Sequence, residues 1–454
     1  MANFLISTMP ASGHVNPALP LAAELVRRDH QVWWHTGRAY ADQVAATCAH
    51  VVPFVHTLDF DQLPVEPDPG DKGMAAGVTA LRKLFIDRMP GQYEDYRAIT
   101  KDFPADVVLA DLCCLGAGAL YDAGGPPYAT LGINPLVTPD PEIPRWGKGA
   151  PPATSAARRL GNRLEHLLGR VLFMPKPTAL LNQARAGIGL PPLPSGKNLG
   201  DLLRSPFLHL MPTTETFEYP RKHLPPQVHF VGPLLPPAPK GYLLPPWWTE
   251  LQERPVVHVT QGTVTTDVAA LTTPTVQALA DDDLLVVVTC PDPNGLGPLP
   301  RNVRGNVRAA RFIPHRLLLP HVDVMVTNAG YNGVLTALAH GVPLVCAGRE
   351  MDRADVSARV AWAGAGIDLK TDTPTADQIG TAVRTILRQR SYRDNARRIQ
   401  ADFATHRPAH EAAALLERLA ASRSPVRRTT STARNSSTNR AASERVAHGP
   451  DLAI

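Results

Sequence analysis

A histidine in a turn is the first residue of this chain whose type and position could do chemistry. His14 follows a short apolar run, Asn3–Thr8, that predicts a buried strand, and it precedes a helix whose start is marked by Asn16 and Pro17. The turn after a strand of an α/β domain lies at the strand's carboxyl end, where ligands bind. There a histidine can take the proton of a hydroxyl group and make its oxygen a nucleophile. The alternative is a purely structural role in the turn.

A histidine that acts as a base needs a group to orient it, and Asp111 is placed to do so. Residues 105–111 (ADVVLAD) predict a buried strand that ends in this carboxylate, again at the carboxyl edge of the sheet. The alternative is that Asp111 only caps the helix predicted over 115–120. Asp106 lies at the opposite end of the strand and is the weaker candidate.

A second turn of this kind lies in the other half of the chain. Val324–Thr327 predicts a buried strand, and the loop 328–333 (NAGYNG) that follows it is rich in glycine and asparagine. A helix then runs to 341–343 (GVP), and Leu344–Ala347 predicts the next strand. The loop of such a unit points free backbone N–H groups at its ligand, which suits a diphosphate. The alternative is a plain structural turn.

The spacing of this unit resembles the donor-binding signature of family 1 glycosyltransferases, which move a sugar from a nucleoside diphosphate to a hydroxyl group. That signature begins with His-x-Gly-x-Asn-Ser, continues through a helix to Gly-Val-Pro, and ends with an acidic residue before Gln. Gly330, Asn332, the triplet 341–343 and Asp352 match it. Four positions differ: Asn328 stands for the phosphate-binding His, Gly333 for Ser, Thr336 for a ribose-binding Glu, and Arg353 for the final Gln.

The resemblance implies further donor contacts in the second half of the chain. Gly262 and Thr263 follow the strand predicted over 255–260, in a turn that lies beside the donor phosphates in the family. Phe312 stands where the family carries an aromatic residue against the nucleotide base, and His315 follows in place of Gln. Asp352 is expected to accept hydrogen bonds from sugar hydroxyls, with the Arg353 cation beside it. An Asn328 amide can still donate to a phosphate oxygen, and Gly333 keeps its backbone N–H.

The opening loop resembles the same family. Residues 13–17 (GHVNP) match its Gly-His-x-x-Pro loop, which implies that His14 is the general base and that Asp111 holds its tautomer. The implied reaction is a single displacement with inversion at the anomeric carbon. The donor would be a UDP- or dTDP-sugar and the acceptor a small lipophilic natural product, macrolide, sterol or lipid. The overall look is closest to bacterial and fungal macrolide- and sterol-type enzymes. No cofactor or metal is expected.

The fold that the resemblance implies is GT-B, an α/β architecture of two facing Rossmann-like, doubly wound domains with a cleft between them. A length of 454 residues also favours two domains. The predicted boundaries are 1–232 for the acceptor-binding domain, 233–246 for a proline-rich linker, 247–400 for the nucleotide-sugar-binding domain, 401–421 for a helix that packs back on the first domain, and 422–454 for a disordered basic tail.

The composition is that of an ordinary globular protein, with 44% hydrophobic and 19% charged residues. Much of the net charge of +5 lies in the tail, which argues against a nucleic-acid-binding body. The 5 cysteines lack CxxC spacing and are expected to be reduced. We predict a cytoplasmic protein without a signal peptide or a membrane span, whose oligomeric state the sequence leaves open.

One helix carries a feature that the family does not explain. Residues 157–173 place six leucines and valines in one stripe, with arginines off it. We expect this stripe to pack on its own domain. The alternative is peripheral contact with a membrane surface.

Two other functions stay open for this architecture. A nucleotide-sugar epimerase or hydrolase would replace the acceptor by water or an enzyme base, but such enzymes place extra carboxylates in the cleft. A non-catalytic, nucleotide-sugar-binding helper of another transferase is suggested by the changes at Asn328, Gly333 and Thr336. A helper has no need for a base, so His14 beside Asp111 discriminates against it.

Overall fold

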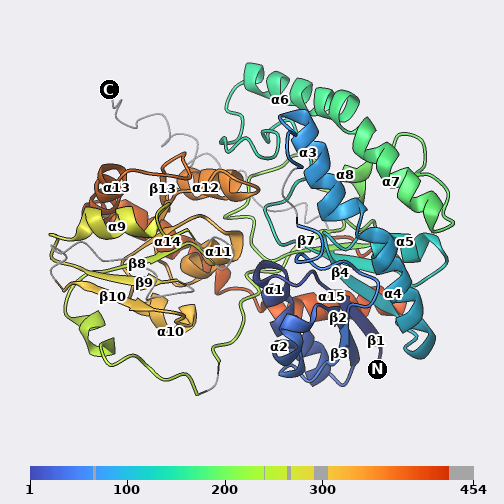
Figure 1. Ribbon diagram of the computed structural model, residues 1–454, viewed down its shortest axis with the longest axis horizontal. Coiled ribbons are helices and arrows are strands. Elements are labelled where there is room, and N and C mark those ends of the chain that lie inside the picture. Colours follow the sequence, from blue (N-terminus) through green and yellow to red (C-terminus); the bar gives the residue numbers. More distant parts are fainter. Residues whose placement is uncertain (65–67, 240, 263–266, 291–304, 429–454) are drawn as a thin grey trace.

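The chain folds around two parallel β-sheets, each covered by helices (Figure 1). The computed structural model describes residues 1–64, 68–239, 241–262, 267–290 and 305–428. Most strand residues of both sheets are buried, because helices cover both faces of a parallel sheet, and the exceptions lie mainly in the edge strands β3 (His50–Pro53), β10 (Val307–Ala310) and β13 (Gly366–Asp368). The α/β class with two doubly wound sheets, which the sequence predicts, is confirmed.

The first sheet has seven strands in the order β3-β2-β1-β4-β5-β6-β7. Its members are short apolar runs, as expected for strands buried on both sides. They are β1 (Asn3–Ser7), β2 (Gln31–Thr36), β3 (His50–Pro53), β4 (Val107–Asp111), β5 (Tyr128–Leu131), β6 (Leu208–Met211) and β7 (Val228–Phe230).

The second sheet has six strands in the order β10-β9-β8-β11-β12-β13. Val, Leu and Ile dominate these strands, and every described pairing in them is parallel. They are β8 (Val256–Thr260), β9 (Leu285–Thr289), β10 (Val307–Ala310), β11 (Val324–Thr327), β12 (Leu344–Cys346) and β13 (Gly366–Asp368).

Helices connect the strands and cover both sheets. In the first half they are α1 (Ser12–Arg27), η1 (Arg38–Tyr40), α2 (Ala41–Ala45), α3 (Met74–Leu81), η2 (Arg82–Ile86), α4 (Met89–Asp102), α5 (Gly116–Asp122), α6 (Ala156–Leu168), η3 (Gly169–Phe173), α7 (Pro175–Gly187) and α8 (Leu199–Leu202). In the second half they are η4 (Trp248–Gln252), α9 (Thr272–Leu279), α10 (His315–Leu318), η6 (Leu319–His321), α11 (Tyr331–Ala339), α12 (Arg353–Trp362), α13 (Ala376–Arg388), α14 (Arg390–Phe403) and α15 (Pro408–Ser422). None of these helices is long and apolar enough to cross a membrane.

Each sheet reverses its strand order once, and these two points define where ligands can bind. The reversal lies between β1 and β4 in the first sheet and between β8 and β11 in the second. In doubly wound sheets the ligand crevice lies beyond the carboxyl ends of the strands at this point. β1 leads into the turn with His14, and β4 ends at Asp111. β8 leads to Gly262, and β11 leads to Asn328.

A buried ion pair joins the two domains beside α12. The Arg359 guanidinium lies 2.6 Å from the carboxylate of Glu218, and Arg221 lies 3.3 Å from the same oxygen. Burial alone would raise the pKa of Glu218, but these two cations hold it below its usual value. The Arg359 guanidinium also stacks 4.1 Å above the ring of Tyr219. The pair therefore fixes α12 of the second domain against the segment after β6 of the first.

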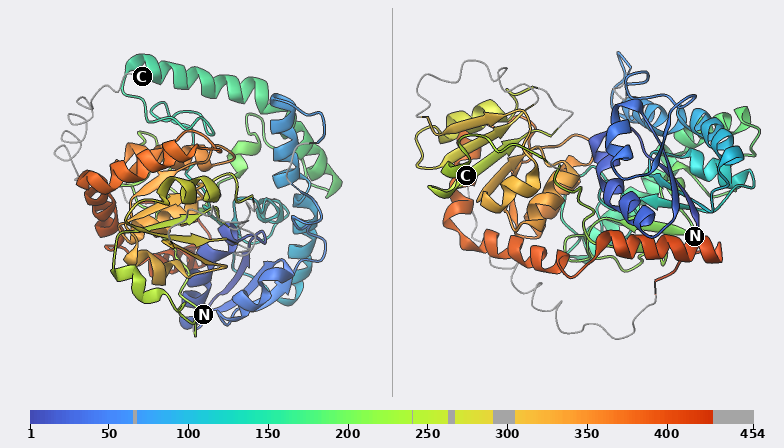
Figure 2. Two further views of the ribbon diagram at one scale, coloured as in Figure 1. Left: turned by 60° about the vertical axis from the view of Figure 1, so that its left-hand side comes forward. Right: turned by 90° about the horizontal axis from the view of Figure 1, so that it is seen from below.

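The C-terminal helices tie the domains together a second time (Figure 2, right). α14 packs on α11 and α13, and α15 packs on α1, β4 and β6 of the first domain. The sequence predicts a disordered tail from residue 422, but the described residues up to 428 lie on the first sheet. Val426 is buried and exchanges hydrogen bonds with Phe207 and His229. The predicted start of the tail is therefore too early.

The prediction for the stripe on 157–173 is wrong. The helix forms as α6 and η3, but its leucines and valines face away from the domain and are between 44% and 66% exposed. The inward side of the helix is polar instead. Asn162 is the one buried residue of α6, and its side-chain amide donates to the carbonyl of Pro141.

We predict that the two partners of the buried ion pair are unequal in their effect on stability. Glu218→Gln leaves two buried guanidinium groups without a carboxylate and should lower the free energy of unfolding by about 3–5 kcal/mol. Arg359→Met should cost less, because the Glu218 carboxylate keeps Arg221 and the backbone N–H groups of Leu136 and Tyr219. Urea denaturation of both variants measures the difference. An equal loss in both would show that Arg221 does not compensate.

Candidate active site

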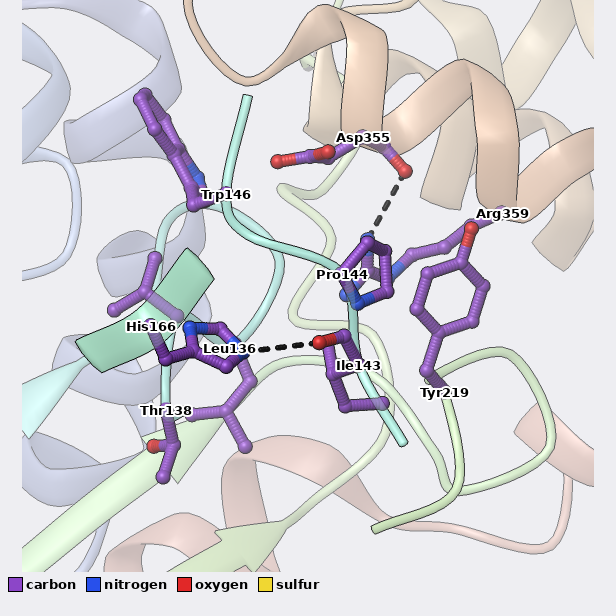
Figure 3. Close-up of a pocket in the computed structure, with 10 residues that line it drawn as sticks. Leu136, Thr138, Ile143, Pro144, Trp146, His166, Tyr219, Asp355 and Arg359 are labelled. Carbon is purple, nitrogen blue, oxygen red and sulfur yellow. Dashed lines mark hydrogen bonds between the residues drawn. The ribbon is translucent and has the colours of Figure 1, made fainter. Parts of the chain in front are cut away.

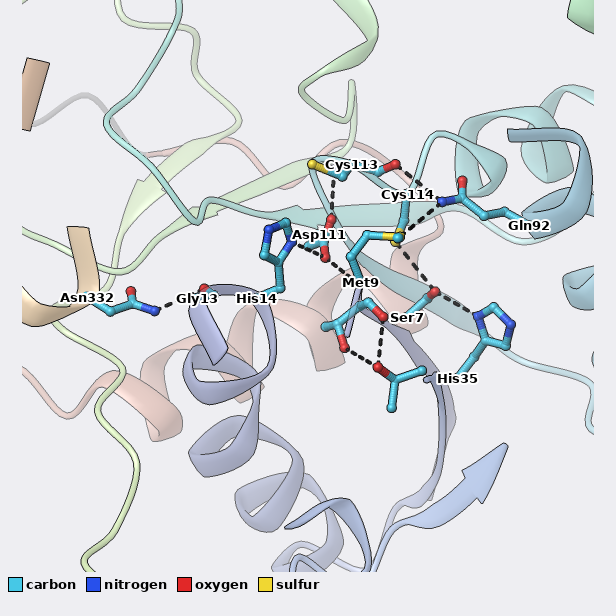
Figure 4. Close-up of polar contacts among 12 residues, drawn as sticks. Ser7, Met9, Gly13, His14, His35, Gln92, Asp111, Cys113, Cys114 and Asn332 are labelled. Carbon is cyan, nitrogen blue, oxygen red and sulfur yellow. Dashed lines mark hydrogen bonds and ion pairs between the residues drawn. The ribbon is translucent and has the colours of Figure 1, made fainter. Parts of the chain in front are cut away.

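The structure brings His14 and Asp111 together at the switch point of the first sheet (Figure 4). His14 Nδ1 lies 2.8 Å from Asp111 Oδ2, and their side chains are 15% and 0% exposed. The carboxylate also accepts hydrogen bonds from the backbone N–H groups of Met9 and Cys113, each at 2.7 Å. Because Asp111 acts as an acceptor throughout, Nδ1 carries the proton and Nε2 keeps the lone pair that a base needs.

The alternative role of Asp111 as a helix cap has limited support in the geometry. The carboxylate accepts from Cys113 in the turn after β4, but the first helical residue of α5 is Gly116 and that helix has no side-chain cap. Asp106, the weaker candidate, accepts from the backbone N–H of Asn3 at the other end of the sheet. Asp111 is therefore the carboxylate that orients His14.

The loop after β11 faces this dyad across the domain boundary. The Asn332 side-chain amide in the first turn of α11 donates to the backbone carbonyl of Gly13, over 2.9 Å (Figure 4). Gly13 immediately precedes His14, so the predicted donor loop and the predicted base lie side by side. The two strand-order reversals therefore contribute to one site between the domains.

Asn328 joins the two turns of the second sheet. Its amide donates to the backbone carbonyl of Gln261, and a Cβ built on Gly262 would lie 3.7 Å from its Oδ1. Gly262 has a φ of +74°, a conformation that glycine adopts without strain. Thr263, the predicted neighbour of the donor phosphates, lies outside the described residues. An amide carries two N–H groups, and this bond engages one of them.

Two residues near the predicted donor contacts have a left-handed backbone conformation. Ala329 and Met351 both have positive φ, +62° and +55°, although neither is glycine. They stand next to Asn328 and Asp352, two of the predicted donor contacts. A left-handed residue costs free energy and persists where the surrounding structure holds it, often at a binding site. Two of the six described non-glycine residues with positive φ thus lie beside predicted donor contacts.

Three of the positions that depart from the family signature have different surroundings. The Thr336 hydroxyl donates 2.6 Å to the carbonyl of Asn332 in its own helix, so its proton is not free for a ribose. A Cβ on Gly333 would lie 3.9 Å from the Met325 side chain, which leaves room for a larger residue. Arg353 Nη1 lies 3.9 Å from the Glu350 carboxylate.

Asp352 is the titratable group of the donor side. Burial raises the pKa of Asp352 to about 6, against the opposing effects of a backbone hydrogen bond and of Arg353. His14 also acts on this pKa, which places the carboxylate within electrostatic reach of the dyad. Near neutral pH most Asp352 side chains are therefore ionised and able to accept hydrogen bonds from hydroxyl groups.

The two residues predicted beside the nucleotide base differ in exposure. The Phe312 ring is 61% exposed, and its backbone carbonyl accepts a hydrogen bond from the Tyr242 hydroxyl at 2.8 Å. Burial lowers the pKa of His315 to about 4, so this imidazole is neutral. It lies edge-on to the buried His258, with 5.5 Å between the ring centroids. Phe312 thus offers a face for stacking, and His315 offers no charge.

The sequence does not identify Phe60, whose ring lies against the imidazole of His14, the predicted general base. Its ring stands edge-on to the His14 imidazole at 6.0 Å, and the buried Arg88 guanidinium lies 4.9 Å from its other side. The segment before it is held by Asp95, which accepts from the backbone N–H groups of His56 and Thr57. A single aromatic residue in a loop gives no periodic signal, so only the fold reveals this contact.

A metal site is the other chemistry that these residues could support. Among the described residues, His14, Asp111 and Cys113 form a group whose possible ligand atoms lie within 4.8 Å of one another. Burial and then the Asp111 charge raise the pKa of the Cys113 thiol well above its usual value, which keeps it protonated. Both Asp111 oxygens are engaged by N–H groups. The group fits an oriented base better than a metal centre.

A small cavity lies between the domains, away from the dyad (Figure 3). Its walls come from the segment after β5, including Ile143 and Trp146, and from Tyr219 and α12. On α12, Asp355 accepts hydrogen bonds from the backbone N–H groups of Gly147 and Gly149, at 2.6 and 2.9 Å. The loop that carries Trp146 is therefore positioned by both domains.

Comparison with known proteins gives one consistent result. Residues 273–419 match the family model described as erythromycin biosynthesis protein CIII-like, C-terminal domain. The chain is 41% identical to 4'-demethylrebeccamycin synthase of Lentzea aerocolonigenes over 92% of this chain and 99% of that protein. It is 30% identical to UDP-glycosyltransferase 2 of Phaeomoniella chlamydospora, covering 88% and 91% of the two chains. The crystal structure of the calicheamicin glycosyltransferase CalG4 aligns with a TM-score of 0.71 at 23% identity, over 94% and 100% of the chains.

We predict that the donor loop depends on the absence of a side chain at residue 348. A Cβ at Gly348 would lie 2.2 Å from the backbone oxygen of Asn328, so Gly348→Ala must displace the loop. The variant should lose the rise in melting temperature that a bound nucleoside diphosphate gives the wild type. Gly333→Ala is the matched control, because its Cβ finds space, and it should keep that rise. Normal nucleotide binding by Gly348→Ala would contradict the prediction.

Proposed function

The chain belongs to the family 1 glycosyltransferases of the GT-B fold, and from this premise we propose a specific reaction and mechanism. We propose that it transfers a sugar from a UDP- or dTDP-sugar to a hydroxyl group of a small lipophilic natural product, with inversion at the anomeric carbon. The observation that carries the proposal is the contact of 2.8 Å between His14 and Asp111 at the ligand edge of the first sheet. The names of the two relatives support the classes of donor and acceptor.

In this mechanism His14 Nε2 takes the proton of the acceptor hydroxyl as its oxygen attacks the anomeric carbon. The bond from that carbon to the diphosphate oxygen breaks on the opposite face, which inverts the configuration. Asp111 stabilises the imidazolium that forms and holds the tautomer, because it accepts from Nδ1. The proton thus stays on the enzyme until the glycoside has left.

The leaving diphosphate needs donors that are already in place. The loop 328–333 leads into α11, whose first-turn N–H groups have no partner within the helix and are the donors of this proposal. The N–H groups of Gly262 and Ala329 donate to the hydroxyls of Thr260 and Thr327, each over 3.3 Å, which holds the two turns in place. Fixed dipoles of this kind stabilise developing negative charge without reorganisation. We propose that these groups do this work and that no metal ion is required. Asp352 and Arg353 would contact the sugar, and Phe312 would stack on the base.

The acceptor side is formed by the first domain. Phe60 beside His14 offers an apolar ring edge, and the loop with Trp146 lies at the domain boundary. Apolar walls with a few polar groups suit a lipophilic acceptor. The two other functions considered above gain no support from these contacts. The dyad is assembled as a base needs, and the matching relatives are named as enzymes.

We predict that both members of the dyad act on the chemical step. His14→Ala and Asp111→Asn should each lower kcat by about 10²–10⁴-fold, the usual contribution of a general base. Thermal-shift titration with UDP and dTDP should give the same nucleotide affinity as in the wild type, which separates lost chemistry from lost folding. The assay pairs UDP- and dTDP-glucose with a panel of hydroxylated polyketides and sterols, and NMR coupling constants of the product report inversion. Wild-type rates in His14→Ala, or a retained anomeric configuration, would overturn the proposed mechanism.

We predict that sugar recognition by Asp352 weakens in acid. The carboxylate has a pKa of about 6, and protonation turns one of its two acceptor oxygens into a donor, so KM for the sugar donor should rise as the pH falls below about 6. The nucleoside diphosphate alone lacks the transferred sugar, so Asp352→Asn should bind it as tightly as the wild type does at each pH. Asp352→Asn should raise KM at pH 7.5 and remove this dependence. Asp377→Asn, an exposed carboxylate in the first turn of α13, is the control.

A further inference from the structure

The helix formed by α6 and η3 is oriented opposite to an ordinary amphipathic surface helix, whose apolar side faces the core. Its apolar side faces outward, and six residues on that side are 44–66% exposed: Leu160, Leu164, Leu167, Leu168, Val171 and Leu172. We call this row the leucine stripe. The helix that carries it runs along the outer edge of the first domain (Figures 1 and 2). Apolar side chains that gather in one exposed row, rather than singly, indicate an interaction surface.

Polar contacts on the opposite side fix this orientation. Arg159 binds the Glu142 carboxylate at 2.8–2.9 Å, and Asn162 donates 2.9 Å to the carbonyl of Pro141. One turn further on, His166 Nε2 lies 3.0 Å from the carbonyl of Ile143. These three residues lie on one face of the helix and all contact the segment 141–143. The helix therefore cannot turn its leucines inward without breaking all of these contacts.

The charges beside the leucine stripe are mainly positive. By the helical period, Arg163 lies along one edge of the stripe and Arg158 along the other, and both side chains are exposed. Arg170 lies on the same side as Arg163. Glu165 is the only acidic residue between 156 and 173, and its carboxylate pairs with Lys148. The apolar surface is thus bordered by positive charge.

This charge pattern decides between possible occupants of the surface. A second copy of the chain would bring the arginine borders of both helices together, with only the Glu165 carboxylates, already paired with Lys148, to offset them. An anionic lipid surface instead offers phosphates to the arginines and an apolar layer to the leucines. A strongly amphipathic helix of low overall hydrophobicity with cationic borders is the kind that lies in the plane of a membrane interface.

We propose that the leucine stripe docks on an anionic lipid bilayer, with the leucines in the boundary between headgroups and acyl chains and with Arg158 and Arg163 against lipid phosphates. The contact would be peripheral and reversible. The segment 141–143 that holds the helix leads directly into the loop with Trp146, so docking would place the acceptor-side loop near the lipid. The inference does not depend on the proposed reaction, since it rests on the surface alone.

Co-sedimentation of the full-length chain with vesicles tests the proposal. The wild type should sediment with vesicles of phosphatidylcholine mixed with phosphatidylglycerol, less with phosphatidylcholine alone, and less as salt is raised. The double variant Leu164→Gln/Leu168→Gln should lower the partition coefficient by at least about tenfold. Arg158→Gln/Arg163→Gln should remove the preference for phosphatidylglycerol. All the substituted side chains are exposed, so melting temperatures should stay at the wild-type value.

A matched control uses two leucines of similar exposure elsewhere. Leu243 and Leu244 in the linker are 88% and 51% exposed, and Leu243→Gln/Leu244→Gln should leave vesicle binding unchanged. Failure of the wild type to bind anionic vesicles at low salt would overturn the proposal. Equal binding by the Leu164→Gln/Leu168→Gln variant would do the same. Light scattering that detects a dimer abolished by that variant would assign the stripe to a second copy instead.

Discussion

The structure depends on one constraint, which is that both sheets are parallel and buried on both faces. Such strands are mostly apolar along their length, so the polar groups that face a ligand stand at or beyond their carboxyl ends. His14 and Asp111 occupy the ends of β1 and β4, and Gly262 and Asn328 those of β8 and β11. Asp111 is the last residue of its strand, and its carboxylate is fully buried. The free-energy cost of burying this charge is offset by hydrogen bonds from backbone N–H groups and by His14. The site therefore follows from sheet topology before any single side chain is considered.

Two such edges make one active site only if the domains are held face to face. The contacts across the boundary are polar and specific: Asn332 to Gly13, Asp355 to the loop with Trp146, and Arg359 to Glu218. Buried ion pairs contribute little net stability. They strongly destabilise any other arrangement of the domains, because a misplaced partner leaves a buried charge unpaired. This selectivity suits a joint whose geometry matters more than its strength. It places His14 within electrostatic reach of Asp352 on the other domain.

The sequence predicts those features that short-range patterns encode. The apolar runs and the turn chemistry at Asn16, Pro17 and 328–333 locate the strands, the turns and both members of the dyad. The sequence does not predict which side of α6 faces inward, because the periodicity is the same for either orientation. Its inward side is chosen by Glu142 and the carbonyls of 141–143, which lie on a separate segment. Phe60 and Val426 are missed for a related reason, since each acts through contacts with residues distant in sequence.

The departures from the family signature suggest how this donor loop compensates. The Asn328 side-chain amide donates one N–H to the backbone carbonyl of Gln261 and so links the turn after β8 to the loop after β11. The Thr336 hydroxyl donates its hydrogen bond to a backbone carbonyl within α11. A loop that lacks the charged or imidazole side chains of the signature has to rely on its backbone, and a backbone site works only if its N–H groups are held rigidly. The strained φ of Ala329 and the close packing of Gly348 against the Asn328 carbonyl provide that rigidity. The same reliance explains why a single Cβ at residue 348 should harm the site more than the absence of a serine at residue 333.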